Sequence, residues 1–420
     1  MEIYTDILTL FFIGYCLLYN GFLFFYVLIK YRERRRDEER PLPANGEWPI
    51  LTIMIPALNE GKVLRNTVAS LFAQRYPGIL EVLVIDDGSE DVTPLVTARL
   101  QSEYPRFYVY RRERPHAREG KGEALNAGLR FLLEKFPDRP RQTWVIGVFD
   151  ADGRLVEPDF LEQVGLAFSD LSVNALQCGV RIRNRHKLLP ALQDVEFVAF
   201  SWIVQWVRDR VSGAVALGGN GQFIRADCLE LLQSQGPWAK WALTEDLEIS
   251  VRLHQLPGRI RFLDRHVSQE GVESWRALFK QRRRWAWGTL QVFVRYVASG
   301  ALWRAPMPLL RKLDLHYYLS FWIVPFVVLA SWGLAVLSWL GQVKVGNSFP
   351  VFFLLANSFS FWPTMVLALH RIGIALWIIP QLVLLGTLYS YHWIPLLFLA
   401  WGDILRKKKP HWLKTQRIYS

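Results

Sequence analysis

The chain has 420 residues, of which 51% are hydrophobic and 21% are charged. This length suits one large domain with additions, and the 18 Trp indicate a water-soluble body attached to membrane segments. The net charge of +12 is spread over short runs, which favours an anionic membrane surface and a phosphate-bearing substrate and argues against nucleic acid as a partner. The 3 Cys have no zinc-type spacing and predict no disulfide framework, as in a reducing cytosolic environment.

The N-terminal stretch Ile7–Ile29 carries no charge and predicts a membrane-spanning helix, because it is long enough to cross a hydrocarbon core of about 30 Å. A signal peptide is the alternative, but the apolar part is too long, no basic region precedes it and no small-residue cleavage site follows. A basic run from Lys30 to Arg36 follows, so the positive-inside rule places the N-terminus outside and the next segment in the cytoplasm. We therefore expect an anchor over residues 1–30 and a linker over residues 31–47.

From Trp48 onward, short apolar runs alternate with segments of helical spacing. The runs that predict strands are 50–55, 80–85, 107–110, 144–149 and 175–180, and the segments that predict helices are 60–74, 91–102, 120–135 and 158–168. We expect Pro56 to stop the first strand. This order predicts an α/β fold with a doubly wound, mostly parallel sheet. Neither G-x-G-x-x-G nor G-x-x-x-x-G-K-[ST] follows the first strand, which argues against a dinucleotide-binding unit and a P-loop nucleotidase.

The apolar run 144–149 ends in two carboxylates, Asp150 and Asp152. In an α/β sheet, ligands bind at the carboxyl ends of strands, and paired acids in such a place are unfavourable unless a positive group joins them. A hard divalent ion, completed by the phosphates of a substrate, fits this requirement. The alternative is that the pair only caps a helix, as such pairs also do.

Other polar clusters fall at the predicted ends of strands or starts of helices. They are Asp86-Asp87, Glu245-Asp246, and a helix that carries Gln281, Arg284 and Trp285. The loop 218–221 (GGNG) can bring backbone N–H groups close to a ligand. Taken singly, Asp86-Asp87 is explained by a turn and Asp246 by a helix N-cap with Thr244. Taken together, the clusters favour a functional site.

Two later segments predict aromatic helices. The segment 188–211 is expected to be a helix that is either buried or lies at the membrane surface. Trp275–Tyr296 predicts a basic amphipathic helix in the membrane interface, with its apolar side among the lipid headgroups. Within it, we interpret Arg282 and Arg283 as charges at the membrane surface.

The C-terminal third predicts membrane segments. The uncharged stretches 317–342 and 345–370 can each span once. The stretch 372–402 is also uncharged but contains two prolines, and a further single span would place the basic run 406–409 outside, against the positive-inside rule. We therefore expect this stretch to be re-entrant, interfacial or a proline-broken pair of short helices, with a cytoplasmic C-terminus.

Taken in order, these sequences resemble a known family. PALNE (56–60), DDGS (86–89), GKGEALN (120–126), DAD (150–152), TED (244–246) and QRRRW (281–285, a Q-x-x-R-W) match motifs of processive, membrane-embedded glycosyltransferases of family 2. Relatives of this kind include bacterial synthases of cellulose, hyaluronan and poly-N-acetylglucosamine. The match covers about residues 50 to 290. It implies a GT-A domain that binds a nucleotide-diphospho-sugar.

The resemblance implies a multi-pass protein of the inner or plasma membrane with a cytosolic catalytic domain. Beyond the anchor and linker, it implies a GT-A domain over residues 48–270, interfacial helices with Q-x-x-R-W over 271–312, transmembrane helices over 313–405 and a basic cytosolic tail over 406–420. The loop 218–221 departs from the acceptor loop of cellulose synthases, so the resemblance does not identify the polymer.

The resemblance also implies a role for each matching residue. Asp246 would be the general base, and Asp152 would be the more direct ligand of Mg²⁺ or Mn²⁺. It places Pro56, Glu60 and Asp87 in the pocket that binds the nucleoside, for which uridine is expected. It also places Lys121, Asp150 and Arg284 among the residues that bind the nucleotide sugar. On the acceptor side it places Asn220, Glu245, Gln281 and Trp285.

The chemistry of sugar transfer agrees with these roles. Cleavage of the sugar–phosphate bond increases the negative charge of the diphosphate, which a divalent ion and Arg284 would stabilise in the transition state. Gln281, Arg284 and Trp285 are three and four residues apart and share one helical face. Asp246 can accept the proton of the attacking hydroxyl. One base without a second nucleophilic carboxylate predicts a single displacement with inversion, which gives a β-linkage from an α-linked donor.

Three functions are compatible with this sequence. The first, which Q-x-x-R-W favours, is polymerisation of a β-linked exopolysaccharide and its export through the protein's own transmembrane region. The second is transfer of one sugar to a membrane lipid carrier. The third is a non-catalytic membrane subunit, against which the intact acids of every motif argue. The expected partners are a nucleotide sugar, a polysaccharide acceptor and membrane lipid, and the need for an accessory subunit stays open.

Overall fold

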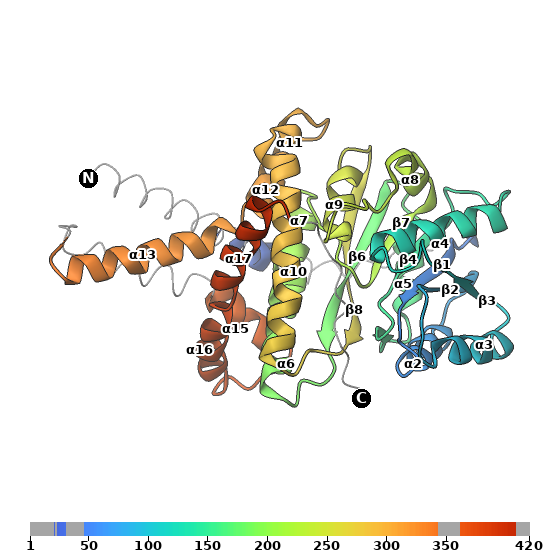
Figure 1. Cartoon of the computed structure of the whole chain (residues 1–420), viewed down its shortest axis with the longest axis horizontal. Coiled ribbons are helices and arrows are strands. Elements are labelled where there is room, and N and C mark those ends of the chain that lie inside the picture. The colour runs from blue at the N-terminus through green and yellow to red at the C-terminus, as the bar shows by residue number, and fades with distance from the viewer. Residues whose placement is uncertain (1–20, 22, 31–45, 343–361, 409–420) are drawn as a thin grey trace.

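The computed structural model describes residue 21 and residues 23–30, 46–342 and 362–408. The described residues contain one sheet of 8 strands in the order β3-β2-β1-β4-β7-β6-β8-β5 (Figure 1). The strands are β1 (Ile50–Ala57), β2 (Leu80–Asp86), β3 (Phe107–Arg111), β4 (Trp144–Val148), β5 (Arg154–Leu155), β6 (Val173–Ile182), β7 (Gln222–Arg225) and β8 (Arg259–Gln269). Neighbours from β3 to β4 are parallel, whereas β7 runs antiparallel to both β4 and β6. The predicted α/β fold is confirmed, with a parallel half and a mixed half.

The end of β1 differs from the prediction. The strand continues through Pro56 to Ala57, whereas we expected Pro56 to stop it. The pairing of β1 with β4 ends at Met54, so beyond that point β1 pairs only with β2. A proline, which has no N–H, is tolerated where one side of a strand is unpaired.

Helices join the sheet to the C-terminal part of the chain. Those of the sheet region are α2 (Leu64–Phe72), α3 (Thr93–Glu103), α4 (Lys121–Lys135), α5 (Phe160–Phe168), α8 (Ala226–Leu231) and α9 (Glu245–Leu253). The predicted helix 188–211 is continuous, as α6 (Leu188–Val198), the π-helix η2 (Ala199–Gln205) and α7 (Trp206–Val211). The later helices are α10 (Trp275–Phe293), α11 (Ala301–Arg304), α12 (Leu309–Leu319), α13 (Ile323–Trp339), α15 (Trp362–Arg371), α16 (Ile379–Ser390) and α17 (Trp393–Leu405).

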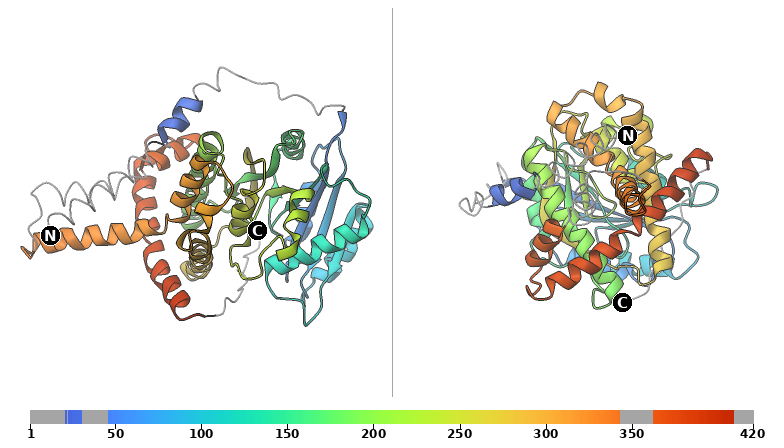
Figure 2. Two further views of the ribbon diagram at one scale, coloured as in Figure 1. Left: turned by 90° about the horizontal axis from the view of Figure 1, so that it is seen from above. Right: turned by 90° about the vertical axis from the view of Figure 1, so that its left-hand side faces the viewer.

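Helix α10 lies between the sheet region and the C-terminal helices. Figure 1 shows it standing beside β8 on one side and α15 to α17 on the other, and Figure 2 shows α13 projecting away from the rest. Contacts between α10 and α17 are extensive. The helix that carries Q-x-x-R-W is therefore the central link between the two parts of the molecule.

The membrane segments are described only in part. Within the described ranges, one helical stretch, Ile379–Leu405, is long and apolar enough to cross a bilayer by length and composition. It consists of α16 and α17 with two residues between them, which fits one of the three predicted alternatives, the proline-broken pair of short helices. Of the predicted span 317–342, α13 forms the central part. Most of the predicted N-terminal anchor, much of the linker and of the span 345–370, and residues 409–420 lie outside the described residues.

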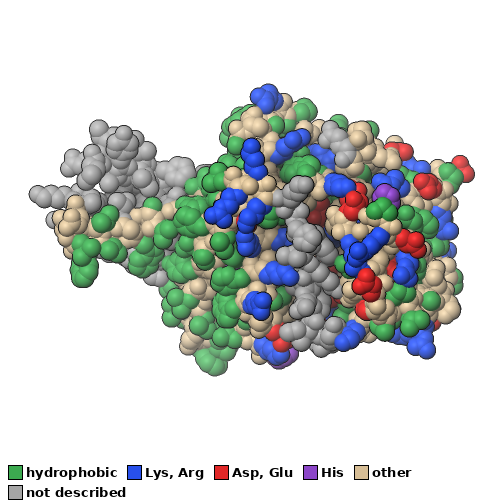
Figure 3. All heavy atoms as spheres, viewed as in Figure 1, with side chains coloured by type: hydrophobic (Ala, Val, Ile, Leu, Met, Phe, Trp, Pro, Cys, Tyr) green, Lys and Arg blue, Asp and Glu red, His purple; other side chains and the backbone are tan. Residues whose placement is uncertain are grey.

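Hydrophobic side chains gather on the surface of the C-terminal helices. Figure 3 shows them over α13 and α15 to α17, at the left of the view, with a column of Lys and Arg beside them and most acidic side chains on the sheet region. Exposed apolar residues of these helices include Phe321, Leu329, Trp332, Leu376, Trp377, Leu384, Leu388, Phe398 and Leu405.

Of the two arginines of α10 that we expected at the membrane surface, Arg282 is buried instead, whereas Arg283 keeps 40% of its side chain exposed. Arg282 is fully buried and forms an ion pair with Glu196 of α6. Arg283 donates from Nε to Asp403 Oδ2 of α17 over 3.0 Å. A buried charge is stable only with a partner, and the sequence does not show these partners because they lie far away along the chain.

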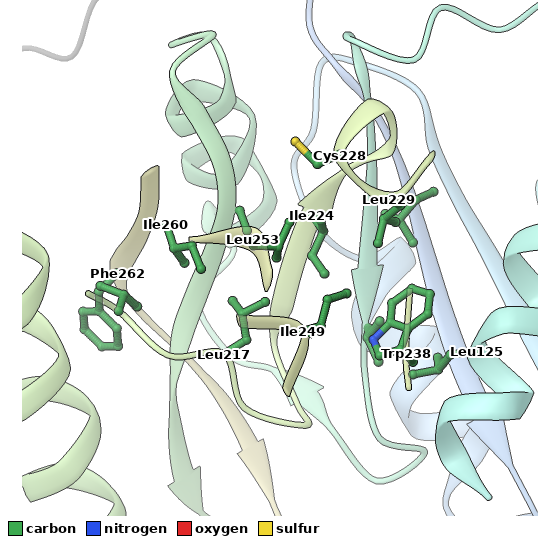
Figure 4. Packing of buried hydrophobic residues seen from close by; sticks show 14 of the residues in the cluster. Leu125, Leu217, Ile224, Cys228, Leu229, Trp238, Ile249, Leu253, Ile260 and Phe262 are labelled. Atoms are coloured by element: carbon green, nitrogen blue, oxygen red, sulfur yellow. The ribbon is translucent and has the colours of Figure 1, made fainter. Parts of the chain in front are cut away.

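Alternating residues of the strands face two hydrophobic cores. In β1, Met54 belongs to the core under α4 and α9, whereas Ile53 and Ile55 belong to the core under α2, α3 and α5. Figure 4 shows part of the first core, in which Leu217 lies close to Ile249 of α9. This packing holds the segment 214–219 against α9, next to the carboxyl ends of β1 and β4.

Candidate functional site

A cavity of about 720 Å³ lies at the carboxyl ends of β1, β2 and β4 and extends between α6–η2, α10, α12–α13 and α15–α17. Of the residues predicted for the site, all except Asp152 line it. Their convergence follows from the fold, since the carboxyl ends of parallel strands share one edge of the sheet.

The loops after β1 and β2 are held together by Asn59, which adopts a positive φ of 53°. Its N–H donates to Ser89 Oγ over 2.9 Å, and its Oδ1 accepts from the N–H of Glu90 over 2.8 Å. Asp86 Oδ1 accepts from the N–H of Ser89 over 2.8 Å. These bonds place both loops, and with them Pro56, Glu60 and Asp87, at one end of the cavity.

Asp87 is buried and forms an ion pair with Arg112. Its Oδ1 also accepts from the N–H of Arg118 over 3.0 Å. Burial raises the pKa of Asp87, against the lowering effects of the Arg118 N–H and the Arg112 charge. The carboxyl group is therefore held in one orientation before any nucleotide binds.

Lys121 lies at the start of α4 and joins three parts of the site. Its Nζ donates to Asp150 Oδ1 over 2.7 Å and to the carbonyl of Gly219 over 2.5 Å. Burial would lower the pKa of Lys121, but the charges of Asp150, Glu245 and Asp246 outweigh it and raise the pKa. The ammonium group of Lys121 is thus the cation that interacts with the carboxylates of Asp150, Glu245 and Asp246.

Glu245 and Asp246 begin α9 as adjacent, interacting carboxylates. Burial and the charge of Asp246 raise the pKa of Glu245 to about 7, although Lys121 and Arg284 act to lower it. Burial raises the pKa of Asp246, against the effects of Lys121, the Leu247 N–H and Arg284. A carboxyl group whose pKa lies near neutral pH is suited to accept a proton in catalysis.

The raised pKa of Glu245 predicts a pH-dependent stability. The folded state binds this proton more tightly than the unfolded state, whose pKa is 4.5, so stability is lost as the pH rises from 4.5 to about 7. Glu245→Gln removes this loss. We expect the variant to gain up to a few kcal/mol over the wild type at pH 8 and little at pH 5, in thermal unfolding without ligand. An equal difference at both pH values would contradict the assignment.

Asp150 and Asp152 follow β4, and a buried amide supports their turn. Asn220 Oδ1 accepts from the N–H of Asp150 over 3.2 Å, and Asn220 Nδ2 donates to Gln269 Oε1 over 2.8 Å. Asp152 is 1% exposed, and its Oδ2 accepts from the N–H of Glu270 over 3.0 Å. Asn220 thus serves the position of Asp150, while its predicted contact with an acceptor stays a prediction.

The donor set at this turn suits a hard divalent ion. Within the described parts of the chain, no group of three or more His, Cys, Asp or Glu is arranged to hold a metal by itself. Asp150 lines the cavity and Asp152 follows two residues later, so the pair fits an ion that takes its other ligands from a diphosphate and water, as Mg²⁺ commonly does. The role of these two residues as metal ligands stays a prediction.

Helix α10 presents the predicted trio of Gln281, Arg284 and Trp285 to the cavity. Arg284 makes no hydrogen bond or ion pair with any residue that the structure describes, and its Nε is buried. Its charge nevertheless acts on both Glu245 and Asp246. A guanidinium that is held near acids but not paired is available to an anionic group of a substrate.

Gly219 leaves little room for a side chain. A Cβ there would lie 3.2 Å from Lys121 Nζ and 3.3 Å from Asp246 Oδ2, whereas at Gly218 its nearest neighbour would be 3.7 Å away. We expect Gly219→Ala to lower kcat about tenfold to a hundredfold, because the added methyl group would displace Lys121 Nζ and Asp246 Oδ2. Gly218→Ala is the matched control and should stay near wild type. Equal steady-state rates for the two variants would refute the close packing.

Some residues of the site were not anticipated from the sequence. Gln177 of β6 donates from Nε2 to the Asn220 carbonyl over 3.0 Å and accepts from the N–H of Gly218 over 2.7 Å, which shapes the GGNG loop. Arg112, which orients Asp87, was also missed. Neither has a local signal, because each acts on a residue far away in the sequence.

Comparison with known proteins gives a consistent result. The sequence pattern of a family described as "Glycosyltransferase like family 2" matches residues 49–288. The chain is 31% identical over 398 residues to the beta-monoglucosyldiacylglycerol synthase of Synechocystis sp., which covers 90% of this chain and 78% of the relative. It is 28% identical over 428 residues to the probable glycosyltransferase YdaM of Bacillus subtilis, covering 97% and 98%.

More distant matches extend the comparison. The poly-beta-1,6-N-acetyl-D-glucosamine synthase of Staphylococcus epidermidis is 23% identical over 246 residues, which is 58% of this chain and 56% of that protein. Among solved structures, the mannosyltransferase PcManGT of Pyrobaculum calidifontis, in complex with GDP-Man and Mn²⁺, aligns with a TM-score of 0.60 and 20% identity over 97% of this chain and 99% of its own. This likeness shows a shared fold.

Proposed function

The chain belongs to family 2 of the glycosyltransferases, and from this premise we propose that it transfers one sugar from a nucleotide-diphospho-sugar to a neutral membrane lipid of the diacylglycerol type. This is the second of the functions that the sequence leaves open. The match to a glucosyldiacylglycerol synthase, over 90% of the chain, supports it above the polysaccharide synthase, whose match covers 58%. We therefore prefer a lipid acceptor to the polysaccharide acceptor expected from Q-x-x-R-W.

The observation that carries the proposal is the shape of the cavity. The same cavity that contains Asp246 and Arg284 continues between helices with an apolar lining, which includes Phe197, Phe200, Ile203, Phe321, Met365 and Leu397. An apolar chamber favours the acyl chains of a lipid, because their burial removes hydrocarbon from water.

The surface over the C-terminal helices supports a membrane location. Its exposed apolar residues and the neighbouring basic side chains suit insertion into an anionic interface (Figure 3). The apolar part of the cavity lies between these same helices. We propose that the lipid reaches the site from this side while the GT-A domain stays in the cytosol.

The polar end of the cavity is the part that we assign to the nucleotide-sugar donor. We propose that Pro56, Glu60 and Asp87 contact the nucleoside, with uridine as the expected base, and that Lys121 and Arg284 face the diphosphate. The names of the relatives favour glucose as the sugar. Asp150 and Asp152 would hold Mg²⁺ or Mn²⁺, which when bound would offset charge on the diphosphate.

The proposed reaction is a single displacement. The lipid hydroxyl attacks the anomeric carbon, its proton passes to Asp246, and the bond from the anomeric carbon to the diphosphate oxygen breaks. Arg284 stabilises the charge that develops on the leaving diphosphate. Glu245, Gln281 and Trp285 would contact the acceptor from α9 and α10. Attack on the face opposite the leaving group inverts the anomeric centre and gives a β-linked product.

An acceptor comparison tests the function. The purified full-length protein is given UDP-glucose and Mn²⁺ with dioleoylglycerol, a polyprenyl phosphate or a short β-linked oligosaccharide, and UDP release is measured. We expect release to depend on dioleoylglycerol. Release that depends only on the phosphate lipid or on the oligosaccharide would overturn the proposed acceptor.

A further inference from the structure

We propose that Arg282 is a positioning residue for the acceptor side of the site, which it connects through Glu196 to the C-terminal helices α16 and α17. The inference rests on the proposed function only in taking Gln281 and Trp285 as acceptor contacts.

Arg282 contacts both of these acceptor-side residues from within the protein. Its Nη1 donates to Gln281 Oε1 over 3.1 Å, and its Cζ lies 4.0 Å from the centroid of the Trp285 ring. Arg282 itself is fully buried and does not line the cavity. A planar guanidinium that stacks on one ring and bonds one amide restricts the rotamers of both side chains.

Glu196 connects this arginine to the C-terminal helices. Its Oε2 accepts from Arg282 Nη2 over 2.6 Å and from the Tyr389 hydroxyl of α16 over 2.7 Å. Its Oε1 accepts from Trp393 Nε1 of α17 over 3.2 Å. One carboxylate of α6 thus joins α10, α16 and α17 at the wall of the cavity.

The ion pair keeps its charges despite its burial. Burial would raise the pKa of Glu196, but the Arg282 charge and the bonds to Glu196 outweigh it and lower the pKa. A buried pair of this kind is unfavourable to break, because removing either partner would leave an uncompensated charge. The helices that carry Tyr389 and Trp393 also expose apolar side chains to the surroundings. The packing of α16 and α17 against α6 and α10 therefore determines the positions in which Gln281 and Trp285 contact the acceptor.

Two consecutive arginines of α10, Arg282 and Arg283, have different partners, which supplies a matched control. Arg283 pairs with Asp403 of α17 outside the cavity, whereas Arg282 pairs with Glu196 and contacts the acceptor-side residues. Both tie α10 to its neighbours. Of these two arginines, Arg282 is the one that bonds Gln281 and stacks on Trp285.

The test compares Arg282→Lys with Arg283→Lys and with Tyr389→Phe. Lysine keeps a charge for Glu196 but cannot both stack on Trp285 and bond Gln281. We expect Arg282→Lys to raise the KM for dioleoylglycerol about tenfold, with the KM for UDP-glucose unchanged. Tyr389→Phe removes one bond to Glu196 and should raise the acceptor KM by about threefold. Arg283→Lys should leave both constants near wild type.

Melting temperatures of all variants are measured in parallel. If Arg282→Lys folds poorly, Tyr389→Phe still tests the connection, since it removes only a hydroxyl. Equal changes in donor and acceptor KM, or the same effect from Arg283→Lys, would overturn the proposal and leave Arg282 as a fold-stabilising residue. If another acceptor proves to be the substrate, the same comparison is made with it, so that a wrong acceptor assignment and a wrong role for Arg282 give separate results.

Discussion

Replacement of Asp246 by Asn is expected to lower the rate of sugar transfer about 10²- to 10⁴-fold, because it removes the proposed general base without changing the shape of the side chain. Asp246 lines the same cavity as Lys121 and Arg284, and burial raises its pKa. The affinity for UDP should persist, since the nucleoside contacts lie on other loops. Steady-state transfer and calorimetric titration with UDP measure the two quantities.

Glu245 supplies the comparison for this experiment. It is adjacent to Asp246 and buried, and its own pKa is raised to about 7. We expect Glu245→Gln to lower transfer much less than Asp246→Asn. The reverse order would move the role of base to Glu245, and unchanged turnover in Asp246→Asn would remove Asp246 from the mechanism.

Arg284→Met is expected to lower kcat about 10²- to 10³-fold, because a preorganised donor to the leaving diphosphate is lost. The guanidinium lines the cavity and has no ion-pair or hydrogen-bond partner among the described residues, so its removal leaves no protein carboxylate unpaired. Arg284→Lys should recover part of the rate, since it restores the charge but not bidentate bonding. The measurement is kcat with saturating UDP-glucose and acceptor.

Arg283→Met is the matched control for Arg284→Met. It makes the same change one residue away on α10, and Asp403 keeps a second cation, since Lys408 Nζ lies 2.7 Å from its Oδ1. We expect kcat to stay within severalfold of wild type. A similar loss in both variants would mean that α10 responds to the loss of any charge, and Arg284 would have no special role.

The parallel half of the sheet could be predicted from the sequence because its strands are uniform apolar runs. β2 and β4 are buried over almost their entire length, and their only charged residues are Glu81 and the terminal Asp86 of β2. β8 was missed because Arg259, Arg261 and Asp264 interrupt its apolar residues, so that its buried and partly exposed positions follow no regular period. β7 has only 4 residues and gives too short a signal.

The residues of the candidate site could be predicted from the sequence, but the contacts that hold them in place could not. The motif acids converge because they follow strands that end at one edge of the sheet. The burial of Arg282 could not be predicted, because its partner Glu196 is 86 residues away and a basic side chain on an amphipathic helix normally faces solvent. The motifs also could not predict the proposed acceptor, because Q-x-x-R-W lies on α10 and carries no information about the apolar part of the cavity.

The length and linkage of the product test the central claim most directly. The full-length protein is incubated with dioleoylglycerol and a large excess of UDP-glucose, and the lipid product is examined by mass spectrometry and by NMR of its anomeric proton. We predict one glucose per lipid in β-linkage, however large the excess of donor. A ladder of longer chains, or an α-linked sugar, would contradict single inverting transfer to a lipid hydroxyl.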